Sequence, residues 1–166
     1  MSKLKTLLLG ALLALAGSAM AHITLEQQSA AADTYYKAVL RVGHGCDGSP
    51  TRAIVVQLPP GAQHPHPMPK AGWTLSSRAD PASGAVTEVA WRGGTLADAH
   101  YDEFVVRVKL PAQAGPLWFR VHQQCEQGAN DWAEVPASGT DTRALKRPAA
   151  LLDVHPAPAH AQAHAH

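Results

Sequence analysis

His22 has the most specific chemistry in this sequence, because it directly follows a run of small residues, GSAMA (17–21). If the chain is cut after Ala21, His22 becomes the first residue and gains a free α-amine, which gives up its proton to a metal near neutral pH. The amine and Nδ1 of the imidazole then close a six-membered chelate ring on one ion. Two nitrogens in this arrangement suit Cu(II), which prefers tetragonal N and O coordination. The alternative is that His22 lies beside the cut and has no ligand role.

Residues 1–21 have the three parts of a secretory signal peptide. Lys3 and Lys5 form the positive start, residues 7–16 are apolar, and Ala19, Met20 and Ala21 match the A-x-A cleavage pattern. The apolar part is shorter than the ~20 residues that span a bilayer. We therefore expect a secreted, periplasmic protein with no membrane span after the signal is removed.

A second cleavage site, after Ala19, stays open. It would leave Met20 first and His22 third. A third-position histidine also binds Cu(II), through the amine, two deprotonated amides and the imidazole. We favour the cut after Ala21, because it matches the A-x-A pattern better.

Composition and charge exclude several other functions. The formal net charge is +1, and loss of Lys3 and Lys5 makes it −1, with no stripe of Lys and Arg left. Nucleic acid is therefore not an expected partner. The sequence also has no G-x-S-x-G, H-E-x-x-H or P-loop motif, so we expect no enzyme of those classes.

The elements that must position His22 are short strands. Alternating apolar and polar residues predict them, with Gly and Pro turns between them and no helical period after residue 21. We expect an antiparallel β-sandwich. The segments are TYYKAVLRV (34–42), TRAIVVQL (51–58), EFVVRVKL (103–110) and PLWFRVHQ (116–123), with GWTLSS (72–77) and VTEVAWR (86–92) as shorter candidates; the turns are HGCDGSP (44–50), LPPGAQHPHPMPK (58–70), DPASG (80–84), WRGG (91–94) and LPAQAGP (110–116).

The two cysteines, Cys46 and Cys125, each follow one of these strands. In an exported chain the oxidising compartment favours a disulfide between them. The alternative is a pair of thiolate metal ligands, which requires reduced cysteines.

Six blocks of the sequence resemble the YcnI-like family of exported copper-binding domains. They are HITL (22–25), YKAVLRVGHGCDGSPT (36–51), PMPKAGWTL (67–75), VTEVAWRGGTL (86–96), YDEFVVRVKLP (101–111) and QQCEQGANDWAEVP (123–136). The resemblance implies an immunoglobulin- or cupredoxin-like β-sandwich. It also implies one Cu(II) held by a single-histidine brace, with a carboxylate and a nearby tryptophan beside the mature N-terminal histidine.

Carried onto this chain, the resemblance assigns the metal site to His22, Trp132 and Glu134. In an extended NDWAEVP segment, Trp132 and Glu134 would share a face. Glu134 would donate oxygen, and Trp132 would shield the ion or lie against it. The alternative is that Trp132 is a core residue and Glu134 is solvated. Asp47 is a reserve ligand, because the expected disulfide brings His44 and Asp47 towards Trp132, although Asp47 also suits a turn.

The chain changes character at Pro148. Residues 148–166 are rich in Ala and Pro and predict a disordered tail, in place of the hydrophobic helix that tethers many family members. The expected domain is therefore 22–147. The tail histidines are weak metal ligands or merely solubilise the chain; they are His155, His160, His164 and His166.

His64, His66 and Met68 combine imidazoles with a thioether, which suits Cu(I), although a stiff Pro-rich loop explains them equally. Taken together, these features predict a non-enzymatic Cu(II)-binding protein for copper delivery or homeostasis. The family resemblance alone implies a copper transporter or an oxidase-assembly chaperone as partner. Two alternatives stay open: a copper-dependent oxidase or monooxygenase that uses His22, and an interaction module in which His22 binds nothing.

Overall fold

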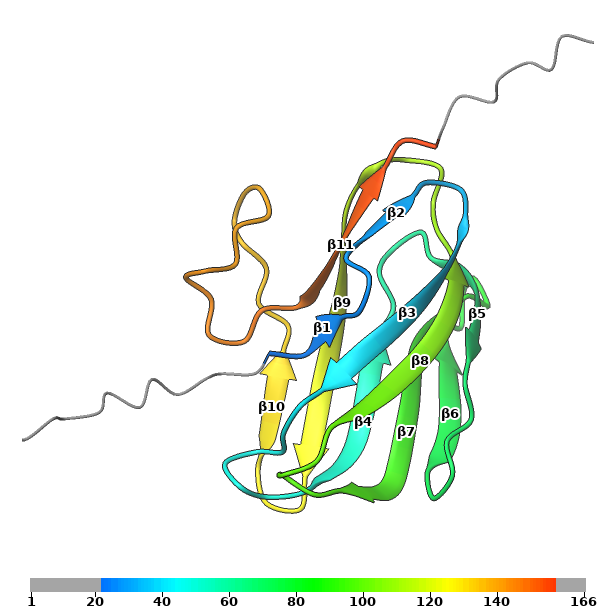
Figure 1. Ribbon diagram of the computed structural model, residues 1–166. Helices are drawn as coiled ribbons and strands as arrows, with labels where there is room; N and C mark the ends of the chain where they lie inside the picture. Colours follow the sequence, from blue (N-terminus) through cyan, green and yellow to red (C-terminus); the bar gives the residue numbers. More distant parts are fainter. Residues whose placement is uncertain (1–21, 158–166) are drawn as a thin grey trace, which may run out of the picture.

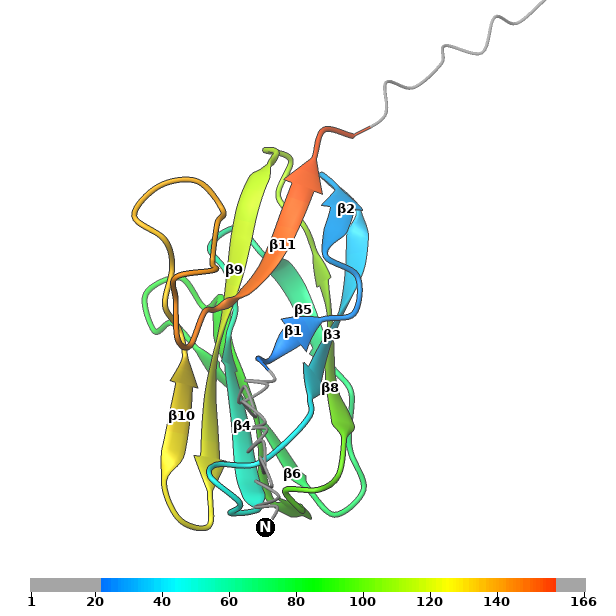
Figure 2. The same cartoon turned by 60° about the vertical axis from the view of Figure 1, so that its left-hand side comes forward.

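The computed structural model describes residues 22–157 of the chain. In this range eleven strands form two sheets that face each other (Figures 1 and 2). The strands are β1 (Thr24–Leu25), β2 (Ser29–Ala31), β3 (Tyr35–Val42), β4 (Thr51–Gln57), β5 (Gln63–Pro67), β6 (Thr74–Ala79), β7 (Val86–Leu96), β8 (Asp102–Lys109), β9 (Gly115–Cys125), β10 (Ala129–Trp132) and β11 (Ala150–His155). None of the described residues forms a helix long and apolar enough to cross a membrane.

One sheet has the order β1-β3-β8-β5, and the larger one has the order β2-β11-β9-β4-β7-β6. β10 and β11 pair with successive halves of β9, β11 with residues 115–119 and β10 with residues 121–124. Every strand pair is antiparallel except β11 with β2, which is parallel. The β-sandwich predicted from the sequence is confirmed.

The core lies between the sheets and follows the predicted alternation. In β3, Tyr36, Ala38, Leu40 and Val42 are buried. The alternate apolar residues of β4 and β8 are buried too: Ile54, Val56, Phe104, Val106 and Val108. Four aromatic side chains are the largest fully buried groups: Trp91, Trp132, Phe104 and Phe119. Burying such alternating apolar faces is the main stabilising contribution to a two-layer fold.

The expected disordered tail from Pro148 is wrong for its first part. β11 pairs with β9 and β2, and Ala150, Leu152 and Val154 are buried while Asp153 and His155 are exposed. This period of two supplies one edge of the core, so the domain extends past residue 147 to β11. His160, His164 and His166 lie outside the described residues, as does the expected signal peptide.

Two expected turns are also parts of strands. The Pro-rich segment around His64 and His66 contains β5, an edge strand, where proline is tolerated because one side makes no ladder bonds. WRGG lies inside β7, and Gly93 has a φ of +79° that suits glycine at a β-bulge. A Cβ on Gly94 would clash with the Trp73 ring, so only glycine fits there.

Candidate metal centre

His22 lies two residues before β1 and is followed by Ile23, which is buried in the core between the two sheets. β1 pairs with β3, with Thr24 opposite Arg41, and this pairing fixes the start of the described chain. The half-buried imidazole meets the indole of Trp132 edge to face, with ring centroids 5.8 Å apart and an interplanar angle of 60°. His22 and Trp132, which the family resemblance assigns to one site, are therefore in contact although they are far apart in the sequence.

A buried amide fixes the Trp132 ring. Trp132 is 2% exposed, and its Nε1 donates to Oε1 of Gln123 at 2.9 Å. The Gln123 Nε2 donates to the His44 carbonyl at 2.7 Å and to Thr51 Oγ1 at 2.8 Å. An unpaired buried polar group is costly, so these three hydrogen bonds hold the indole in one orientation. No role is expected for Gln123 from the sequence, although it follows Phe119 and Val121 on the inward face of β9.

His44 brings a second imidazole to the same indole. Its ring lies 6.3 Å from the Trp132 ring, at 72° between planes. The disulfide between Cys46 and Cys125, with Cα atoms 6.0 Å apart, ties this segment to the end of β9. The predicted disulfide is confirmed, and the thiolate-ligand alternative does not match this pairing.

Glu134 pairs through its backbone with a segment that borders a hollow beside His22. The hollow measures about 130 Å³ and is bordered by His22, Thr142, Pro148 and Ala149, among others. Glu134 pairs with Pro148 in a parallel bridge, and its carbonyl accepts from the Ala149 N–H at 2.8 Å. The backbone of Glu134 is therefore the neighbour of the chain segment that faces His22.

The carboxylate of Glu134 is exposed and holds the returning loop. Its Oε2 accepts from the backbone N–H groups of Lys146 at 2.9 Å and Arg147 at 3.2 Å. β10 ends at Trp132, so the regular alternation that would place both side chains on one face stops before Glu134. The indole is in the core and the carboxylate is at the surface, so the expectation that the two side chains share a face is wrong.

The reserve ligand Asp47 lies in a tight turn. Its φ is +49°, and the turn is closed by two backbone hydrogen bonds between Cys46 and Ser49. It borders a separate hollow together with Glu126 and Gln127. The structure thus gives Asp47 the turn position that its residue type favours, and places His44 of the same segment beside Trp132.

The donor set at His22 suits a two-nitrogen brace better than a cage of side chains. Among residues 22–157, no three His, Cys, Asp or Glu side chains are close enough together to hold a metal ion. A site at His22 would therefore depend on the α-amine of the processed chain. Both hydrogen bonds of the Glu134 carboxylate use Oε2, and Oε1 has no hydrogen-bond partner among the described residues.

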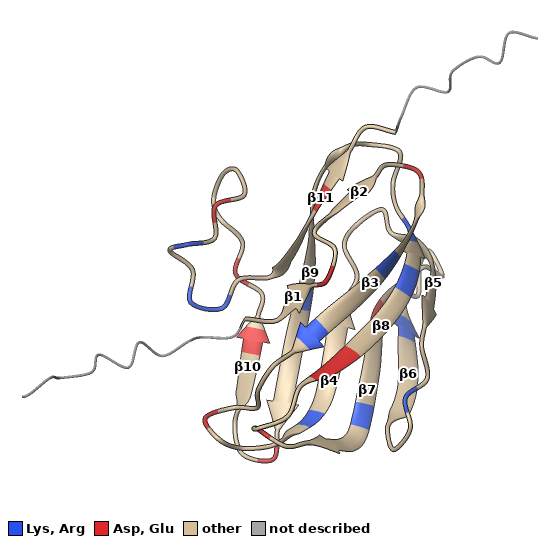
Figure 3. Ribbon diagram, in the orientation of Figure 1, with Lys and Arg blue, Asp and Glu red and all other residues tan. Residues whose placement is uncertain are grey.

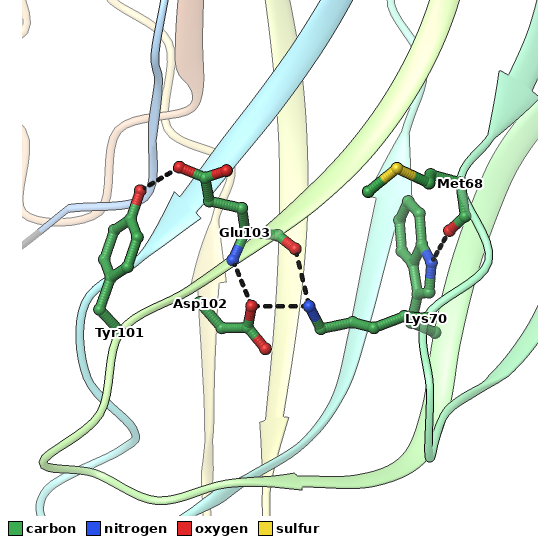
Figure 4. A network of polar contacts seen from close by, with 6 residues as sticks. Met68, Lys70, Tyr101, Asp102 and Glu103 are labelled. Atoms are coloured by element: carbon green, nitrogen blue, oxygen red, sulfur yellow. Dashed lines mark hydrogen bonds and ion pairs between the residues drawn. The ribbon is translucent and has the colours of Figure 1, made fainter.

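The thioether and imidazoles of the 64–68 segment lie elsewhere, along β5. Met68 is 52% exposed, and its carbonyl accepts from Trp91 Nε1 at 2.8 Å (Figure 4). Nearby, Lys70 Nζ donates to Asp102 Oδ1 at 2.6 Å and to the Glu103 carbonyl at 3.1 Å. These bonds anchor the chain after β5 to β8. Tyr101 donates to Glu103 Oε1 at 2.6 Å in the same network.

Comparisons with known proteins agree with this fold. The family model described as "Domain of unknown function (DUF1775)" matches residues 22–154. A solved structure of an uncharacterized protein from Nocardia farcinica, described as an immunoglobulin-like fold, is 25% identical with a TM-score of 0.67. That similarity covers 80% of this chain and 97% of the other. No curated protein matches. The YcnI-like proteins are placed in the matched family, so the resemblance is confirmed: the chain belongs to the DUF1775 family.

Proposed function

We propose that this protein is exported, cut after Ala21, and then binds one Cu(II) through the α-amine and Nδ1 of His22. Glu134 supplies an oxygen donor, and the protein serves copper delivery or homeostasis. The observation that carries the proposal is the contact of the His22 imidazole with the Trp132 indole. The family match, which begins at residue 22, also supports processing at this point.

Each residue of the centre has a task that its position supports. The two nitrogens of His22 chelate the ion, and deprotonation of the amine couples binding to pH. The Trp132 ring, held by Gln123, packs edge to face with the imidazole and supports it. Glu134 offsets the charge of the dication while holding the 146–147 segment. Bound copper supplies a redox-active cation that a partner accepts as cargo.

Secretion and partner follow from the same reasoning. A disulfide between Cys46 and Cys125 suits an oxidising compartment such as the periplasm. The family resemblance makes a copper transporter or an oxidase-assembly chaperone the expected acceptor of the ion.

A competition titration with a Cu(II) chelator of known affinity tests this function. The background is the processed chain with His160, His164 and His166 changed to Ala, which removes binding by those histidines. His22→Ala should lower Cu(II) affinity more than about 100-fold, beyond the loss typical of outer-shell changes. Acetylation of the α-amine should do the same while keeping the imidazole.

The matched control is His100→Ala, which removes an exposed histidine from a turn. It should leave the affinity unchanged. Equal Cu(II) affinity for the His22→Ala chain and its background would contradict the proposal. Oxygen uptake with ascorbate and copper that rises with an added polysaccharide would instead support the oxidase alternative.

A further inference from the structure

The outer face of the larger sheet has a hollow of about 440 Å³ that crosses β7, β4, β9 and β10. Val55 is at its centre, with Ala90 opposite it on β7 and His122 opposite it on β9. The neighbours of Val55 on β4, Ile54 and Val56, face the core instead. The short side chain of Val55 thus lies on the floor of the hollow, and longer side chains such as Arg92 and Arg120 surround it.

The acidic residues of this hollow already have partners. Glu88 forms an ion pair with Arg78 at 2.6 Å, and Asp131 pairs with His122 Nδ1 at 2.5 Å. The Asp131 contact also fixes one nitrogen of the imidazole. Neither carboxylate therefore needs a further cation.

Unlike the two carboxylates, the two arginines of the hollow have no ion-pair partner among the described residues. Within the described part of the chain, Arg92 and Arg120 form no ion pair and no side-chain hydrogen bond, and both are exposed. The hollow thus offers two guanidinium forks, each suited to a planar oxyanion. Figure 3 shows a basic band on β7 and an acidic band on β10.

Strand register separates the two guanidinium groups. Arg92 stands opposite Ala53, and Arg120 stands opposite Gln57, four residues further along β4. With ~3.3 Å per residue and ~4.8 Å per strand, their Cα atoms differ by about 13 Å along the strands and 10 Å across them. Long arginine side chains can close part of this distance, but one compact anion cannot fill both forks.

We propose that this hollow binds a ligand with at least two separated carboxylates, one at Arg92 and one at Arg120. Gln57 and His122 lie between the two and provide hydrogen-bonding groups for the middle of the ligand. The ligand is a free organic polycarboxylate or an acidic segment of a partner protein. The hollow is on the opposite face of β9 and β10 from His22, so binding requires no metal.

The test is a ¹⁵N–¹H NMR titration of the processed, metal-free chain. The probes are tricarballylate, a capped peptide of alternating Glu and Asp, the uncharged triamide of tricarballylate, and inorganic phosphate. We expect saturable shifts on β4, β7 and β9 with one of the carboxylate probes. Arg92→Gln combined with Arg120→Gln should weaken this binding at least about tenfold.

The charge-matched control is Lys37→Gln with Arg107→Gln, two residues opposite each other on the other sheet. It should change the affinity less than about twofold. Tighter binding of the peptide identifies a protein partner, and equal or tighter binding of tricarballylate identifies a free acid. The proposal is overturned if both double variants lose the same affinity for the carboxylate probes, or if the uncharged triamide binds as tightly as tricarballylate. It is also overturned if phosphate binds more tightly than the carboxylate probes, or if no probe gives saturable shifts.

Discussion

The two faces of the β9–β10 hairpin have opposite chemistry although they share the same backbone. On the inner face, Gln123 and Trp132 are buried and hydrogen-bonded to each other. On the outer face, one residue away on each strand, His122 and Asp131 pair at the surface, with side chains 42% and 73% exposed. Because side chains alternate between the two faces of a strand, the inner residues support the candidate metal centre and the outer residues line the hydrated hollow.

This difference shows how burial decides what a polar contact does. In the described chain no buried side-chain N or O lacks a hydrogen-bond partner. Such groups hold one geometry, because leaving one unpaired costs ~1–3 kcal/mol. Exposed pairs contribute little to stability and exchange readily with solvent or ligand.

Removal of the disulfide between Cys46 and Cys125 should have the largest effect on stability. Cys46→Ser with Cys125→Ser opens a link between residues 79 apart in sequence. The free energy of unfolding should fall by about 4 kcal/mol, since the unfolded chain regains loop entropy. Urea unfolding measures this, and reduction of the wild-type protein should match it. A loss below about 1 kcal/mol would show that packing alone keeps the Cys46 segment at the end of β9.

Neighbouring glutamines give the sharpest test of the two faces. Gln123→Leu leaves Trp132 Nε1 and the His44 carbonyl without this partner, and should cost about 2 kcal/mol. It should also weaken Cu(II) binding at His22, because the indole loses its fixed orientation. Gln124→Leu, on the exposed side, should change stability by less than about 0.5 kcal/mol. If urea unfolding shows the same loss of stability for Gln123→Leu and Gln124→Leu, the inner and outer faces do not differ in this way.

Tyr36 extends the test to the facing sheet, where it packs near Phe119 of β9. Burial, with a smaller contribution from Glu26, raises the pKa of Tyr36 to about 12. The unfolded chain releases this proton near pH ~10, so the stabilisation is complete below pH 10 and is lost as pH rises towards 12. Between pH 9 and 11 the loss should be about 1 kcal/mol.

Tyr36→Phe should remove this part of the pH dependence. The difference between variant and wild type isolates Tyr36 from all other titrating groups. Tyr35→Phe, at an adjacent residue that is 54% exposed, is the matched control and should retain the wild-type slope. An unchanged slope in Tyr36→Phe, measured by urea unfolding at both pH values, would contradict the assignment.

The smallest effect is expected on the outer face. Asp131→Asn removes the charge that faces His122, and should change the free energy of unfolding by at most about 0.5 kcal/mol, because the pair is solvent-screened. Thermal unfolding at low and high salt measures this. A cost comparable to that of Gln123→Leu would mean that the outer pair is structural.

Strong alternation made most of the fold predictable. β3, β4, β8 and β9 carry long apolar rows, and their inward apolar residues are buried apart from Leu117, which is half-buried. β11 was missed because Pro and Ala around it suggested disorder, although Leu152 and Val154 alternate with polar residues. β5 was missed because proline usually excludes a strand, and only the free edge of β5 permits it.

The candidate site was predictable only in part, for a similar reason. The disulfide and the meeting of His22 with Trp132 followed from residue types and family resemblance. The position of the Glu134 carboxylate did not, because it depends on where β10 ends and how the 146–147 segment returns. Gln123 and His44 were underrated, because their roles arise from tertiary contacts that local spacing does not encode.

A crystal structure of the processed protein grown with Cu(II), phased at the copper absorption edge, tests the central claim most directly. We expect one strong anomalous peak about 2 Å from both the α-amine and Nδ1 of His22, beside the Trp132 ring. A peak near His64, His66 or Met68 with nothing at His22 would contradict it.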